Sequence, residues 1–156
     1  MRFGIILTFE NPVFQTYAIA AALVILKLSL HSYFTVFRMI RSNGGMLNPE
    51  DLNKTVLNPD PSPDQIKPND FVERTRRMHR NEMENGLPFL ICGLLFVLTE
   101  PNLLLAKVLL YGYVLARLLH FCAYAAAMAH EVRAALFTLG SIATIVMALL
   151  VLVAAM

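Results

Sequence analysis

Hydrophobic residues in this sequence gather in long blocks that are separated by short polar stretches. The first block covers residues 13–40, and two further blocks cover residues 103–129 and 134–155. Each is long enough for the roughly 20 apolar residues with which a helix crosses a bilayer. Runs of this length are typical of membrane helices and exceed the short periodic runs of a water-facing core. The pattern therefore predicts membrane-spanning helices.

A further helix is predicted at residues 71–99, and its two halves differ. The first half is charged and follows the N-cap candidates Asn69 and Asp70, whereas residues 86–99 are continuously apolar. This apolar half is too short to span a hydrocarbon core of about 30 Å. The charged half must then enter the membrane with its charges facing protein or water. The whole chain, residues 1–156, is thus predicted to be one all-α domain, a four-transmembrane-helix bundle.

Residues 42–69 are polar and rich in Gly and Pro, which predicts a loop outside the membrane. From Arg38 to Arg80 there are eight Lys/Arg and six Asp/Glu. The positive-inside rule places this basic excess in the cytosol, and four crossings then place both termini in the lumen. A cleaved signal peptide is the rival interpretation of the first block. It is disfavoured because the block exceeds the roughly 7–15 apolar residues of a signal sequence.

Composition supports lipid as the main solvent. The chain is 57% hydrophobic and 15% charged, whereas a soluble domain carries about 25% charged residues. Basic residues are interleaved with acidic ones, which argues against nucleic-acid binding. Cys92 and Cys122 lie in apolar blocks and imply no disulfide framework. No metal site is expected, because His120 and His130 cannot share a helical face.

Polar side chains form stripes on two of the predicted helices. One stripe consists of Glu73, Arg77, Asn81 and Glu84, flanked by Arg74 and Arg80, and the other of Arg117, His120 and Tyr124. An Arg within a span costs about 2.5–3.5 kcal/mol, so it is normally paired or lines a cavity. Glu84 is the expected partner of Arg117. Pro88 is expected to kink the helix and open room for a ligand.

A purely structural interpretation competes with the ligand site. The Arg117–Glu84 pair can be an ion pair alone, and the arginines can form a belt that faces lipid phosphates. A belt needs only cations, however, and has no use for Glu84, Asn81 or His120. A zwitterionic ligand would use all of these groups.

Two smaller groups of polar residues are interpreted as structural. Lys27 and His31 are expected to snorkel or to face the bundle, and His130-Glu131 is expected to form a solvated turn.

Residues 72–85, VERTRRMHRNEMEN, followed by Pro88-Phe89, resemble the second-helix motif of the MAPEG family (membrane-associated proteins in eicosanoid and glutathione metabolism). Further matches are Asn48-Pro49-Glu50-Asp51, Ala116-Arg117-Leu118-Leu119-His120 with Tyr124, and Arg133-Ala134-Ala135-Leu136-Phe137. The resemblance implies a homotrimer of four-helix subunits, with glutathione bound between neighbouring subunits near the cytosolic side. It also implies the endoplasmic reticulum membrane, with the mitochondrial outer membrane as the alternative.

The resemblance implies that glutathione is the co-substrate and that no metal takes part. Its implied contacts are Arg38, Arg77, Arg80, Asn81, Glu84, His120, Tyr124 and Arg133, with Arg133 as the catalytic residue beside the thiol. On the first helix, Arg41 is the alternative to Arg38. Arginine forks suit the two carboxylates of glutathione, and Glu84 suits its amine. The implied partners are lipophilic electrophiles or lipid hydroperoxides, which reach the thiolate from the membrane lipid.

Within the family, the sequence is more similar to the microsomal glutathione S-transferase type than to the prostaglandin E synthase type. The latter has a Ser directly after the thiol-side Arg and a Tyr three residues later, where this chain has Ala134 and Phe137. We therefore expect a transferase, with glutathione-dependent reduction of lipid hydroperoxides as an added activity. A prostaglandin isomerase and a non-catalytic scaffold that binds lipid mediators are the alternatives.

Overall fold

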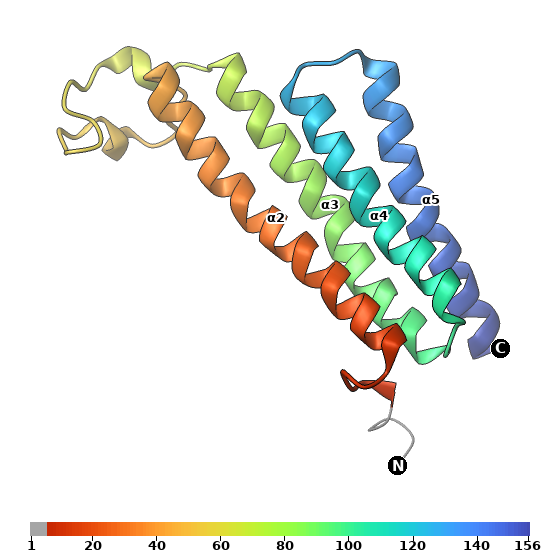
Figure 1. Cartoon of the computed structure of the whole chain (residues 1–156). Coiled ribbons are helices and arrows are strands. Elements are labelled where there is room, and N and C mark those ends of the chain that lie inside the picture. The colour runs from red at the N-terminus through yellow and green to blue at the C-terminus, as the bar shows by residue number, and fades with distance from the viewer. Residues whose placement is uncertain (1–5) are drawn as a thin grey trace.

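A computed structural model describes residues 6–156, in which four long helices lie side by side (Figure 1). The helices are α2 (Pro12–Ser42), α3 (Asp70–Leu98), α4 (Leu103–Ala125) and α5 (His130–Ala155). Two short 3-10 helices, η1 (Pro49–Leu52) and η2 (Pro63–Ile66), lie in the segment between α2 and α3. The predicted all-α fold with four helices is confirmed.

Polar residues at the helix ends explain where three of these helices begin. Asn11, Asn69 and Asn102 precede α2, α3 and α4, and each side chain accepts a hydrogen bond from a backbone N–H of the first turn. Helix α2 ends at Asn43, which adopts a left-handed φ of 46°. The sequence therefore marks these helix ends locally.

The predicted boundary between the third and fourth spans is wrong. Helix α4 ends at Ala125, not at residue 129, because Ala127 adopts a left-handed φ of 56°. The backbone N–H of Met128 donates to the carbonyl of Ala123, which closes the helix end in a Schellman arrangement. Helix α5 accordingly starts at His130, so the predicted turn at His130 belongs to the first turn of a helix.

Among residues 6–156, three helices are long and apolar enough to cross a membrane, namely α2, α4 and α5. Helix α3 has the length, but charged residues fill its first half. It nevertheless packs along α2 and lies within the bundle (Figure 1). The crossing of the membrane by α3 stays a prediction.

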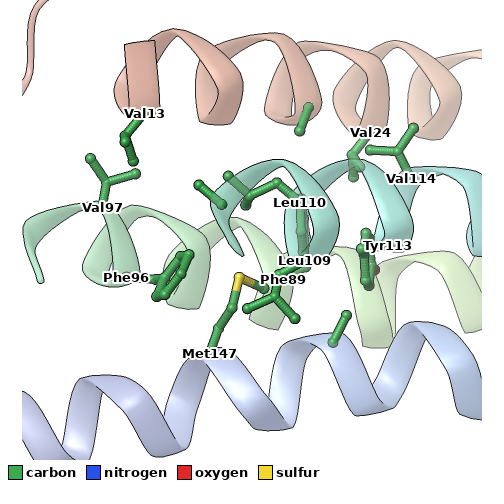
Figure 2. Close-up of a cluster of buried hydrophobic side chains, with 13 residues drawn as sticks. Val13, Val24, Phe89, Phe96, Val97, Leu109, Leu110, Tyr113, Val114 and Met147 are labelled. Carbon is green, nitrogen blue, oxygen red and sulfur yellow. The ribbon is translucent and has the colours of Figure 1, made fainter. Parts of the chain in front are cut away.

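Apolar side chains from all four helices form the core in the half of the bundle that is nearer the termini (Figure 2). The ring of Phe89 from α3 stacks on Tyr113 from α4, with ring centroids 3.8 Å apart and nearly parallel planes. Val24 from α2 and Met147 from α5 are buried around this pair. Helix α3 continues through Pro88, beside the stacked rings, to Leu98.

Buried amides hold the α2–α3 segment together. The side chains of Asn58 and Gln65 exchange two hydrogen bonds of 2.9 Å, and Gln65 Nε2 also donates to Asn43 Oδ1 at 2.6 Å. Arg76 on α3 donates to the backbone carbonyl of Gly45. These contacts attach the segment to the ends of α2 and α3.

Candidate functional site

Two cationic side chains and one carboxylate meet inside the bundle and form what we call the ion cluster: Lys27, Arg117 and Glu82. Glu82 Oε2 lies 2.8 Å from Lys27 Nζ and 2.9 Å from Arg117 Nη2. Lys27 Nζ also donates to the backbone carbonyl of Arg117 at 3.1 Å. All three side chains are buried. The cluster ties α2, α3 and α4 together inside the bundle.

The predicted pairing of Arg117 with Glu84 is wrong, because Arg117 binds Glu82 and Glu84 is exposed. Two residues turn an α-helix by about 200°, so the two carboxylates point to opposite sides of α3. Buried residues on the inward side of α3 recur every three or four positions, and they include Met78, Glu82 and Phe89. This spacing was the signal in the sequence that Glu82 faces the bundle.

Lys27 and His31 both face the bundle, which was one of the two expectations for them; neither snorkels. His31 Nδ1 lies 2.8 Å from the carbonyl of Lys27, and its ring lies beside His79 of α3, with centroids 5.8 Å apart. Sequence reasoning did not give Lys27 a role in a polar site.

Asn81 links the ion cluster to the outer side of α3. Arg117 Nη2 donates to Asn81 Oδ1 at 2.7 Å and to the backbone carbonyl of the same residue at 3.3 Å. Asn81 is half-buried, whereas Arg117 is buried. Its side chain therefore lies between the buried charges and the surface of the subunit.

Three of the predicted ligand residues form an exposed polar surface on α3, which we call the α3 stripe: Arg77, Arg80 and Glu84. Exposed Met83 and Leu87 lie on the same helix. Charges on a helix of a membrane bundle are costly unless protein, water or a ligand covers them. The stripe is therefore expected to be covered by protein, water or a ligand.

Three further predicted ligand residues meet where α4 ends and α5 begins, in what we call the α4–α5 cluster: His120, Tyr124 and Arg133. The guanidinium carbon of Arg133 lies 4.6 Å from the centroid of the Tyr124 ring. The rings of His120 and Tyr124 are in edge contact at 5.6 Å, and Phe137 of α5 lies 6.3 Å from His120. The buried Nε of Arg133 has no hydrogen-bond partner within residues 6–156.

Arg38 is buried, unlike the residues of the α3 stripe. Its guanidinium donates to the carbonyls of Phe71 at 3.1 Å and Ala125 at 3.3 Å. It also lies over the rings of Phe34 and Phe71, at 4.5 Å and 4.2 Å. Arg38 therefore joins the ends of three helices, and its role as a ligand contact stays a prediction.

Two further kinds of group remain to be described, namely side chains that could bind a metal ion and the cysteine thiols. No group of three or more His, Cys, Asp or Glu side chains in residues 6–156 is arranged to hold a metal ion. Cys92 and Cys122 are free thiols, the first half-buried and the second exposed. The site is therefore best described by its arginines, carboxylates, amide and imidazole.

Known proteins are similar to this chain along most of its length. A model of the MAPEG family matches residues 17–153. Microsomal glutathione S-transferase 1 of Bos taurus is 34% identical over 139 residues, which cover 89% of this chain and 88% of that protein. The Homo sapiens protein of the same name is 34% identical over 140 residues, with the same coverage. Prostaglandin E synthase of Homo sapiens is 26% identical over 146 residues, which cover 94% of this chain and 92% of that protein.

Proposed function

The chain belongs to the MAPEG family, and from this premise we propose that it is a membrane glutathione S-transferase that joins glutathione to lipophilic electrophiles. One observation carries the proposal: the α3 stripe exposes two guanidinium groups and a carboxylate on a helix of a membrane bundle. The relatives at 34% identity that are named glutathione S-transferases support glutathione as the ligand.

Glutathione matches the charges of the α3 stripe. The tripeptide carries two carboxylates and one ammonium group, and a guanidinium can bind a carboxylate through two parallel hydrogen bonds. Arg77 and Arg80 would hold the carboxylates, and Glu84 would hold the ammonium. The tripeptide would thereby cover charges that are otherwise exposed to the membrane.

The α4–α5 cluster would activate the thiol. A nearby cation favours the thiolate over the thiol, and the thiolate is the nucleophile. Arg133 supplies this cation, and its contact with the ring of Tyr124 places it beside His120. In conjugation the sulfur forms a bond to the electrophilic carbon, the leaving group departs with its electron pair, and the thiol proton passes to water. The same thiolate would attack a lipid hydroperoxide, break its O–O bond and release the lipid alcohol, which leaves a sulfenic acid on the glutathione sulfur. A second glutathione would then react with the sulfenic acid to give glutathione disulfide and water.

Assembly with further copies would complete the site. The α3 stripe faces away from its own subunit, so a neighbouring copy is the natural cover for the bound tripeptide. We therefore include a homotrimer in the proposal, with Arg38 near the shared site. The endoplasmic reticulum membrane, with the segment 42–69 in the cytosol, completes it.

Turnover by the purified protein tests the proposal. In detergent and in liposomes, the protein should conjugate a chlorinated nitrobenzene, and glutathione should raise the thiolate absorbance near 240 nm. Arg133→Ala should lower turnover roughly 100-fold, as the loss of a single preorganised group at a reacting centre does. Lys107→Ala removes an exposed cation of α4 outside the site and should leave turnover unchanged. A wild-type protein that neither binds nor turns over glutathione would refute the proposal.

A second candidate function rests on the prostaglandin E synthases among the relatives. Supplying a prostaglandin endoperoxide with glutathione and analysing the product separates the two. A prostaglandin E product together with inert nitrobenzene would favour the isomerase.

A further inference from the structure

The side-chain amide of Asn81 has one defined orientation, which follows from its partner. A guanidinium carries only hydrogen-bond donors, so the Asn81 atom that lies 2.7 Å from Arg117 Nη2 must be the acceptor Oδ1. The donor Nδ2 is then left for other partners. Among residues 6–156, Nδ2 of Asn81 has no hydrogen-bond partner.

Arg117 has little freedom to release Asn81. Its Nε and Nη2 both donate to Glu82 Oε2, at 3.3 Å and 2.9 Å. Lys27 holds the same carboxylate oxygen at 2.8 Å. On the α5 side, a Cβ added to Gly140 would lie 3.2 Å from Arg117 Cδ, so the side chain is also packed sterically. The guanidinium is therefore held by Glu82, and the stem of the side chain is packed against α5.

We propose that the ion cluster of Lys27, Glu82 and Arg117 is a positioning device that fixes Asn81 with Nδ2 toward the ligand. The inference rests on the proposed function and deepens it, because it states which ligand chemistry this point accepts. A donor amide binds a carboxylate or a peptide carbonyl oxygen and rejects an ammonium group. None of the three cluster residues needs to touch the ligand.

With this orientation of Asn81, hydrogen-bond donors lie toward one end of the α3 stripe and an acceptor lies toward the other end. Arg77 precedes Asn81 by four residues, so these two neighbours on the helix both present donors. Glu84 follows Asn81 by three residues and presents only acceptors. The carboxylate or carbonyl oxygens of the ligand are thus placed toward Arg77 and Asn81, and its ammonium toward Glu84. A reversed amide would remove this distinction.

The direct test replaces the donor and keeps the acceptor. Asn81→Asp retains an oxygen for Arg117, so the thermal melting temperature should hold, whereas glutathione should bind at least about tenfold more weakly. In ¹⁵N-labelled wild type, the side-chain NH₂ resonance that Asn81→Asp removes should shift when glutathione is added. Glutathione binding with this resonance unmoved, or Asn81→Asp with wild-type affinity, would overturn the inference. Failure of the wild type to bind glutathione would instead refute the proposed function.

The role of the cluster is tested at Lys27, the member farthest along the chain from the α3 stripe. Lys27→Met should raise the KM for glutathione severalfold and leave kcat close to the wild-type value, because the thiol-side residues are intact. Lys107→Met is the matched control, since Lys107 is an exposed lysine of a membrane helix outside the cluster. Its KM should stay at the wild-type value. Equal KM values in wild type and in a folded Lys27→Met protein would overturn the positioning role.

Discussion

Glu82 and Glu84 are separated by a single residue on α3, yet their surroundings have nothing in common. Glu82 is buried between two cations from other helices, whereas Glu84 is exposed. Removal of one member of a buried ion pair leaves the other charge without compensation, and this costs more than the pair itself contributes. Removal of the two carboxylates should therefore have very different effects on stability.

Glu82→Ala should destabilise the protein by about 3–5 kcal/mol, because Lys27 and Arg117 would both keep a buried charge without its partner. Thermal melting in detergent, followed by circular dichroism, measures the loss. Glu84→Ala is the matched control and should melt close to the wild type, because Glu84 is exposed. A Glu82→Ala protein that melts with the wild type would contradict the importance of the ion cluster.

The spacing of the polar residues could predict which of them share a face of α3, whereas the signal for the inward face lies in the apolar residues that recur at the spacing of Glu82. Arg77, Asn81 and Glu84 were selected by their helical spacing, and Glu82 was overlooked because it stands outside that series. The inward face is decided by Met78, Gly86 and their apolar neighbours, which pack on other helices. Pairing across helices is a property of the assembled bundle, and no single helix encodes it.

At the scale of elements, Arg38 connects three helices at the end of the bundle where α4 stops. The apolar core lies toward the other end and does not connect them there. Its guanidinium binds the carbonyl of Phe71 at the start of α3 and that of Ala125 at the end of α4. The sequence could predict a basic residue near this end of the first span. The bound carbonyls belong to distant parts of the chain, so this contact could not be predicted.

Arg38→Lys should lower the melting temperature, because one ammonium group cannot bind both carbonyls and also lie flat on the ring of Phe34. Loss of one hydrogen bond from a charged donor costs about 1.5–3 kcal/mol. Arg41→Lys, at an exposed position of the same helix, should leave the melting temperature unchanged. Equal melting of the two variants would show that Arg38 does not join the helices.

The contact between α4 and α5 depends on a close approach at Gly140. A Cβ there would lie 3.2 Å from Arg117 Cδ, and Arg117 cannot move away because Glu82 and Asn81 hold it. Gly140→Ala should therefore destabilise the protein by about 1–3 kcal/mol. Gly112→Ala on α4 meets nothing within 4 Å and should stabilise the helix by up to about 1 kcal/mol. Opposite shifts in melting temperature are expected, and a stabilising Gly140→Ala would contradict the close packing.

For the whole molecule, the open question is whether α3 crosses the membrane with the other three helices. The charged first half of α3 makes this helix too polar to count as a membrane span by composition. Glu82 in that half nevertheless lies inside the bundle and binds residues of two apolar spans. The described chain begins and ends at the same end of the bundle (Figure 1). Packing thus supports four crossings where composition alone counts three.

Labelling of two engineered cysteines in sealed vesicles decides between these topologies. With four crossings, Val56 in the α2–α3 segment and Met156 at the C-terminus lie on opposite sides of the membrane, whereas three crossings without α3 place them on the same side. Both positions are almost fully exposed, and Cys92→Ser with Cys122→Ser removes the native thiols. A membrane-impermeant maleimide should therefore label only one of Val56→Cys and Met156→Cys from outside, and the other only after detergent is added. Labelling of both from the same side would mean that α3 does not cross the membrane. Its charges could then face water at the membrane surface and would not need the bundle to shield them from lipid.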